Sequence, residues 1–165
     1  MLIWNSIYLP NTYMQRKNKQ KNIIAKYFDG SKKKTAIVIA RWNGEITGGL
    51  FKSALLMLKK NKLKKKNIRV VSVAGSVELP FALHKLAKSG KYDFLVALGC
   101  VVFGDTPHFD YVCKMAQEGV LKVMIEDNIP VGFGVLTVNN LKQAKARIHV
   151  GGEAALAALE LALLK

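Results

Sequence analysis

Short apolar runs alternate with amphipathic segments along most of the chain. Four runs of strand length consist largely of aliphatic residues: Thr35–Ala40, Ile68–Val73, Tyr92–Leu98 and Pro130–Leu136. The third run stops at Gly99, and the pattern predicts four buried strands. Because strands that alternate with helices form parallel sheets covered on both faces, we expect an α/β fold, a three-layer α/β/α sandwich around a parallel four-stranded sheet.

The segments between these runs carry apolar residues at helical spacing. Asn43 is a suitable N-cap for a first helix, which would place Ile46, Leu50, Ala54 and Met57 on one face. Further helices are expected near Pro80, from Pro107, from Asn140 to Arg147, and from Glu153 to Leu164 after Gly151 and Gly152.

The final predicted helix, Glu153–Leu164, has almost no polar face. A helix that is apolar all round must be buried on more than one side. A partner subunit could cover its second side, or the helix could lie within the core of its own chain. We expect the first arrangement, and therefore an obligate homo-oligomer.

Three turns follow the first three predicted strands: Arg41–Gly44, Ala74–Pro80 and Gly99–His108. Turns at the carboxyl ends of parallel strands lie at one edge of the sheet, where ligands bind. We therefore expect these turns to converge on one pocket.

The third turn has the features of an anion site next to a proton-transfer group. Gly99–Asp105 is predicted as a loop, Thr106 as the N-cap and Pro107 as the first helical residue. The free N–H groups and positive dipole of a helix start favour phosphate. They also disfavour imidazolium, so His108 in the first turn is expected to accept a proton. The same spacing also fits an ordinary strand–loop–helix connection that binds no ligand and leaves His108 at the surface.

Charge and composition narrow the function classes. The 165 residues suit one main domain, and the formal net charge is +15. Lysines concentrate in Arg16–Lys34 and Lys59–Lys66, where the adjacent pair Tyr27 and Phe28 are the only aromatic residues and do not alternate with the lysines. A solvated surface is the favoured interpretation, and a nucleic-acid partner is disfavoured. Residues 1–33 are predicted as a basic extension, partly disordered or an edge strand, before a domain over 34–165.

Membrane and metal functions find little support in the sequence. No apolar run reaches the ~18 residues of a membrane span, and Met1–Pro10 lacks the apolar region of a signal peptide. The chain has only two cysteines, which favours a reduced compartment, and we expect this to be the cytoplasm. Because the cysteines do not form a Cys-x-x-Cys pair, we expect no metal site.

Five ordered segments carry a family resemblance. They are Ile39–Asn43, Gly75–Pro80, Tyr92–Val112 with its Gly-Asp-Thr-Pro-His-Phe-Asp-Tyr-Val run, Phe133–Thr137, and Gln143-Ala144 with Arg147. From about Thr35 to Leu164 the chain resembles the lumazine synthase family. The resemblance implies a flavodoxin-like fold and pentamers, sometimes assembled further, with active sites between subunits.

The resemblance also implies a reaction and its residues. The family, a group of transferases, joins 5-amino-6-ribitylaminouracil to 3,4-dihydroxy-2-butanone 4-phosphate in riboflavin biosynthesis, without a metal or organic cofactor. His108 would move protons. The pyrimidine and its ribityl chain would contact Trp42, Asn43, Ser76, Val77, Glu78, Val101, Val102 and Phe133. The phosphate would contact Gly104, Asp105, Thr106 and Arg147. Phe133 and Arg147 would come from the adjacent subunit.

Three departures from the family pattern keep other functions open. Phe103 stands where the family usually has arginine, and Ala74 where it usually has proline. Only Ile148–Gly152 separates Arg147 from the last predicted helix, so a phosphate-binding lysine of the family has no counterpart. Alternatives are a catalytically impaired homologue that binds flavin-like ligands and, less favoured, a basic nucleic-acid-binding protein.

Overall fold

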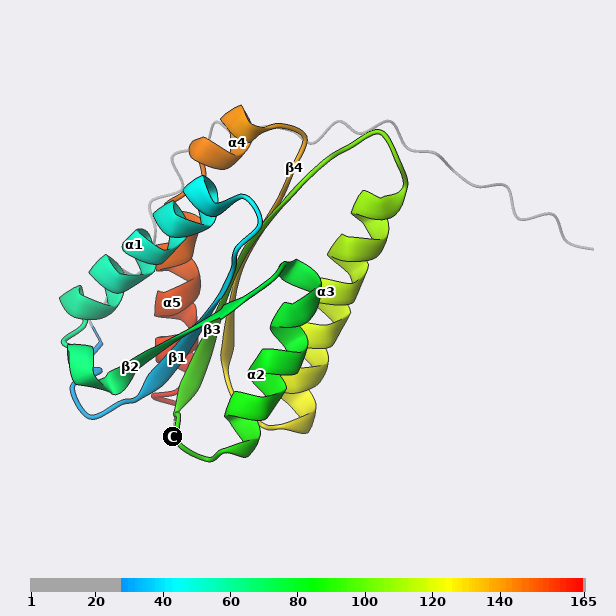
Figure 1. Cartoon of the computed structure of the whole chain (residues 1–165). Helices are drawn as coiled ribbons and strands as arrows, with labels where there is room; N and C mark the ends of the chain where they lie inside the picture. Colours follow the sequence, from blue (N-terminus) through cyan, green and yellow to red (C-terminus); the bar gives the residue numbers. More distant parts are fainter. Residues whose placement is uncertain (1–27, 165) are drawn as a thin grey trace, which may run out of the picture.

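The computed structural model describes residues 28–164 (Figure 1). In chain order the elements are β1 (Thr35–Ala40), α1 (Gly44–Lys60), the 3₁₀ turn η1 (Lys65–Asn67), β2 (Ile68–Val73), the 3₁₀ turn η2 (Ser76–Glu78), α2 (Leu79–Lys88), β3 (Phe94–Val102), α3 (His108–Glu126), β4 (Val131–Val138), α4 (Leu141–Lys145) and α5 (Val150–Leu161). Residues 1–27 lie outside the described part of the chain, and with them the edge strand or disorder that we predicted for the N-terminal extension.

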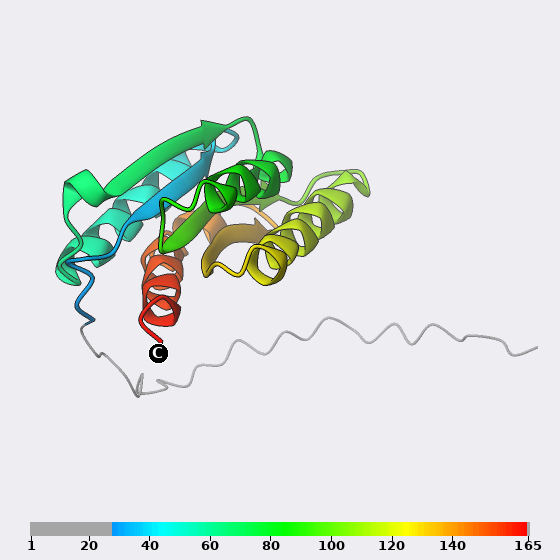
Figure 2. The ribbon, with the colours of Figure 1, turned by 90° about the horizontal axis from the view of Figure 1, so that it is seen from below.

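All four strands are parallel, in the order β2-β1-β3-β4. Helices α1 and α5 cover one face of the sheet, and α2 and α3 cover the other (Figures 1 and 2). The predicted three-layer α/β/α sandwich is therefore confirmed. No helix among residues 28–164 is long and apolar enough to cross a membrane.

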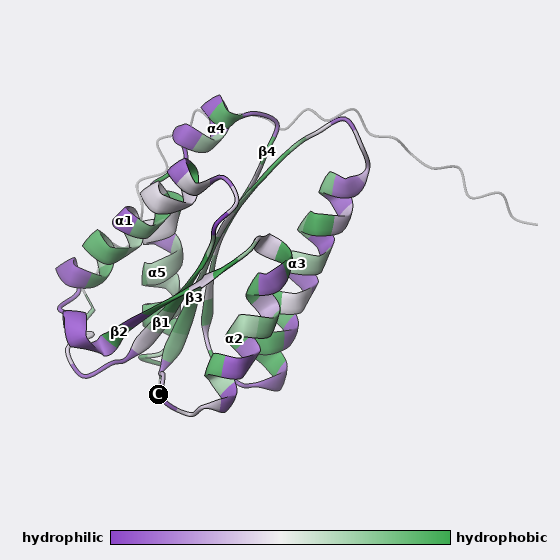
Figure 3. Ribbon diagram, in the orientation of Figure 1, coloured by the Kyte–Doolittle hydropathy of each residue, from purple (hydrophilic) through white to green (hydrophobic). Residues whose placement is uncertain are grey.

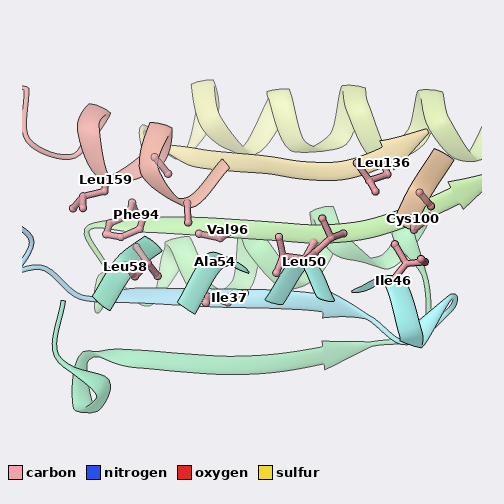
Figure 4. Packing of buried hydrophobic residues seen from close by; sticks show 14 of the residues in the cluster. Ile37, Ile46, Leu50, Ala54, Leu58, Phe94, Val96, Cys100, Leu136 and Leu159 are labelled. Atoms are coloured by element: carbon pink, nitrogen blue, oxygen red, sulfur yellow. The ribbon is translucent and has the colours of Figure 1, made fainter. Parts of the chain in front are cut away.

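The larger core layer lies between the sheet and the α1–α5 pair (Figure 4). Ile37, Leu50, Phe94 and Leu159 are each 0% exposed there. Burial of one such side chain stabilises the fold by about 1.5–3 kcal/mol. The strands thus hold their carboxyl ends in fixed register, which positions the turns that follow them.

Strand β3 is longer than the apolar run predicted, because it continues through Gly99 to Val102. Gly99 pairs with Val135 of β4 and therefore does not end the strand. A Cβ at this position would lie 2.6 Å from Ser76 Oγ, so the close approach of Ser76 requires glycine. The predicted Gly99–Asp105 loop is wrong at its start, and the loop begins after Val102.

Helix α5 also differs from its prediction, because it begins at Val150 and includes Gly151 and Gly152. A Cβ on Gly151 would lie 2.1 Å from the Leu50 carbonyl oxygen. These glycines therefore allow α5 to pack tightly on α1 and do not form a linker. The connection left between α4 and α5 is residues 146–149.

Within one chain, α5 is already buried between α1 and the sheet. Ala155, Ala158 and Leu159 are 0% exposed, whereas Glu153 and Glu160 face outward. Much of this helix is therefore covered within its own chain, as the second of our two expectations had it, although Leu161 at its end is still 42% exposed. Sequence could not separate the two because short apolar side chains fit either surface.

Two helices require smaller corrections, one at its start and one in its buried face. α3 begins at His108 with Pro107 in the N-cap position, and no side chain caps it, so Thr106 is not the cap. In α1 the fourth core position is Leu58, which is 0% exposed, and Met57 is only half-buried.

The outer helices of the other face are joined by an ionic cluster. Asp127, which follows α3, accepts from His84 Nδ1 at 2.8 Å and lies 3.1 Å from Lys88 Nζ, both on α2. Burial opposes ionisation of Asp127, but its bonds to His84 and Lys88 outweigh that effect and lower its pKa.

Candidate active site

The turns after β1 and β2 are held together by backbone hydrogen bonds. The Arg41 N–H donates to Val73 O at 2.9 Å, and the Trp42 N–H donates to Ala74 O at 3.1 Å. The first two predicted loops therefore converge at the carboxyl edge of the sheet, as expected.

Trp42 lies at the top of this joined turn, and its side chain is 73% exposed. Beside it an open hollow of about 360 Å³ is lined by Arg41, Trp42, Asn43 and Ala74. An exposed indole next to an unfilled hollow can stack on a flat heteroaromatic ring.

Asn43 fixes the conformation of this turn. Its backbone is left-handed, with φ 56° and ψ 45°, and its Nδ2 donates to Cys100 O of β3 at 2.9 Å. The side chain does not cap α1, so that prediction is wrong in its detail. Asn43 instead ties the β1 turn to the neighbouring strand.

The second motif forms the turn η2. Ser76 is 5% exposed, next to Gly99, and Val77 is half-buried. A carboxylate oxygen of Glu78 accepts from the Gly75 N–H at 2.7 Å. Glu78 therefore stabilises this turn from an exposed position that a ligand can also reach.

The end of β3 leads into the loop over residues 103–107. Val101 is 9% exposed and Val102 half-buried, and the Phe103 N–H donates to Val138 O at 2.8 Å. The Phe103 ring contacts Phe109 edge to face, with centroids 5.3 Å apart. This aromatic pair joins the loop to the first turn of α3.

The predicted phosphate residues Gly104, Asp105 and Thr106 are all exposed in this loop. His108 is the first residue of the long helix α3 and is exposed as well. Because no side chain caps this helix, its first N–H groups are available to an anion.

Phe133 lies apart from this cluster in the single chain, whereas Arg147 follows α4, whose Lys145 pairs with Glu45 in the first turn of α1 at 2.8 Å. Phe133 is 40% exposed on β4 and pairs with Ala97, whereas Cys100 pairs with Leu136 farther along the strands. Arg147 is exposed after α4, and its Nη1 donates to Gln143 O at 3.0 Å. The chain alone does not bring Phe133 to the hollow.

Arg41 is a lining residue that we did not single out from the sequence. Its Nη1 lies 3.5 Å from Ser72 Oγ, and the side chain is exposed. Its position directly after a predicted strand was the available signal.

Burial raises the pKa of the nearby Cys100 thiol, which favours the neutral form over a nucleophilic thiolate. Among residues 28–164, no three metal-ligating side chains cluster.

Comparison with known proteins agrees with this geometry. A family model described as 6,7-dimethyl-8-ribityllumazine synthase matches residues 32–165. A relative of that name from Phocaeicola vulgatus is 45% identical over 130 residues, which cover 76% of this chain and 77% of the relative. Another, from Desulfovibrio desulfuricans, is 43% identical over 142 residues, which cover 83% of this chain and 91% of the relative.

Proposed function

The chain belongs to the 6,7-dimethyl-8-ribityllumazine synthase family, and on this premise we propose how its site performs the family's reaction. It is a transferase that condenses 5-amino-6-ribitylaminouracil with 3,4-dihydroxy-2-butanone 4-phosphate. The products are 6,7-dimethyl-8-ribityllumazine, phosphate and water, in a step of riboflavin biosynthesis.

One observation carries the assignment of this reaction to the carboxyl edge of the sheet. The β1 turn, η2 and the end of β3 are linked through Arg41, Asn43 and Ser76 around the hollow beside Trp42. The loop over residues 103–107 and the uncapped start of α3 follow the end of β3 at the same edge of the sheet. A ring-binding surface and an anion-binding surface thus lie at one edge, as two substrates of this chemistry require.

We assign the pyrimidine and ribityl chain to the hollow. The Trp42 indole stacks on the pyrimidine ring, and Ser76, Val77, Glu78, Val101 and Val102 contact the rest of the substrate. Asn43 holds the turn through Cys100 and so orients Trp42. The exposed backbone and hydroxyl groups of Gly104, Asp105 and Thr106 bind the phosphate of the second substrate.

The reaction begins when the substrate amine attacks the ketone carbon, which forms an imine and releases water. Elimination of phosphate, ring closure and a second dehydration follow. His108, at the start of α3, accepts and returns protons during these steps. Such general acid–base help contributes typically about 10²–10⁴-fold, and alignment of two bound substrates contributes the rest.

We further propose that the active protein is a homo-oligomer, most simply a pentamer or a multiple of pentamers. Support comes from α3, whose side chains Tyr111, Met115, Leu121 and Ile125 are all more than half exposed. Monomers rarely leave such an apolar face in water. Assembly would also bring Phe133 and Arg147 of one subunit to the hollow of the next.

A cytoplasmic location is supported by both cysteines being free thiols.

Incubation of the purified protein with both substrates tests the function. We expect the absorbance of the lumazine product to rise, with stoichiometric release of phosphate, and no signal when either substrate is omitted. Ligand binding without turnover at any substrate concentration would instead identify an impaired homologue.

A further inference from the structure

The structure gathers two lysine-rich segments that are distant in the sequence. Thr35 pairs with Ile68 at the start of the β1–β2 ladder, and Asn67 Nδ2 donates to Lys33 O at 3.0 Å. The Gly30 N–H donates to Asn61 O at 2.8 Å. The segment before β1 and the segment between α1 and β2 therefore lie side by side at the amino edge of the sheet.

This edge carries a group of exposed basic side chains, which we call the basic end. Its side chains are exposed, and the ribbon is hydrophilic at the end of α1 and in η1 (Figure 3). Its residues are Lys32, Lys34, Lys59, Lys60, Lys62, Lys64, Lys65, Lys66 and Arg69.

Little of this charge is neutralised by the protein. Asp29 lies 3.7 Å from Lys62 Nζ, and Asp93 lies 3.4 Å from Nζ of Lys33, a half-buried lysine beside the basic end. Within residues 28–164, no other ion pair involves the basic end. The remaining ammonium and guanidinium groups are free to meet an external anion.

The surface is suited to phosphate contacts and not to base stacking or membrane insertion. Asn61 and Leu63, which separate its lysines, are 2% and 5% exposed, so the charged heads alone face solvent. Within residues 28–34 and 59–69, Phe28 is the one aromatic residue, and its ring packs against the core. Stacking on single strands and apolar insertion into lipid both need exposed apolar groups that are missing from these segments.

We propose that the basic end binds double-helical nucleic acid through its phosphate backbone, without reading base sequence. The six residues of β1 separate it from the candidate active site by about 20 Å. Nucleic acid and small-molecule substrates can therefore be bound at the same time.

Fluorescence anisotropy with a short mixed-sequence DNA duplex, titrated at several salt concentrations, tests this proposal. If about six side chains engage phosphates, affinity falls about 10³-fold between roughly 50 and 200 mM salt. The triple variant Lys64→Gln, Lys65→Gln, Lys66→Gln should flatten the slope of log affinity against log salt by about 2 to 3.

A control variant, Lys52→Gln, Lys85→Gln, Lys122→Gln, removes the same charge from exposed helix positions elsewhere. It should retain the slope of the unmodified protein, and both variants should retain its mass in solution. Equal weakening by both variants, or no binding at low salt, overturns the proposal. Tighter binding to phosphatidylserine vesicles than to the duplex also overturns it, in favour of a membrane surface. A second duplex of unrelated sequence should bind equally well.

Discussion

Replacement of Asn43 tests how the β1 turn is held. The residue contributes in two separable ways: its left-handed backbone at φ 56°, and the 2.9 Å bond from Nδ2 to Cys100 O. Asparagine and glycine adopt this conformation readily, whereas alanine does so at a cost of about 1–2 kcal/mol. Loss of a half-buried hydrogen bond that leaves a carbonyl unpaired costs about 1–2 kcal/mol.

The two substitutions therefore have different expected sizes. Asn43→Ala loses both contributions, and the free energy of unfolding should fall by about 2–4 kcal/mol. Asn43→Gly keeps the backbone conformation and should lose only about 1–2 kcal/mol. In both variants the Trp42 turn loses its tie to β3, so KM for the pyrimidine substrate should rise more than KM for the butanone phosphate.

Urea unfolding at one fixed protomer concentration measures the first effect, since assembly contributes to apparent stability. Steady-state kinetics with each substrate varied in turn measures the second. If the alanine variant is as stable as the glycine variant, the left-handed backbone is not a constraint. If both variants keep the original KM for the pyrimidine, the turn does not depend on the bond to Cys100.

Four further predictions follow from the site and the core. His108→Ala should fold normally and lose about 10²–10⁴-fold in kcat; unchanged turnover between pH 6 and 8 would remove His108 from the mechanism. Arg147→Ala should raise KM for the butanone phosphate selectively, because charge-assisted bonds to phosphate are strong; an equal effect on both substrates would indicate a structural role. Leu159→Asp buries a carboxylate at a 0% exposed position and should abolish folding, seen by circular dichroism, whereas a folded monomer would restore the case for α5 as an interface. Because the folded pKa of Asp127 is lowered, its contribution to stability is present above its unfolded pKa and is lost as pH falls through its folded pKa; urea midpoints of Asp127→Asn should therefore depend less on pH over the acidic range.

Local patterns in the sequence were enough to predict the layers of the fold. Period-two and continuous apolar runs report which residues are buried in a strand, and helical spacing reports which face of a helix meets the sheet. The strand β1 agrees with its prediction at both ends. The meeting of the turns after β1 and β2 was also predictable, because turns that follow parallel strands share one edge of the sheet.

Only the tertiary structure decided what the glycines and asparagine do. Gly99 resembles a strand end in the sequence, but Ser76 from a distant turn occupies the space that a Cβ would need. Gly151 resembles a linker residue, but the backbone of Leu50 lies against it. Asn43 resembles a helix cap, but its side chain finds a carbonyl on β3. Each role depends on a contact between residues far apart in sequence, which no local pattern contains.

The same reason governs the two larger surprises. The apolar residues of α5 are buried by α1 and the sheet, and hydropathy alone does not distinguish that cover from a second subunit. The lysine runs on either side of α1 read as separate solvated segments, until strand pairing of β1 with β2 places them on one surface. Composition sets the amount of charge and apolar area in this chain, and chain topology decides where each of them lies.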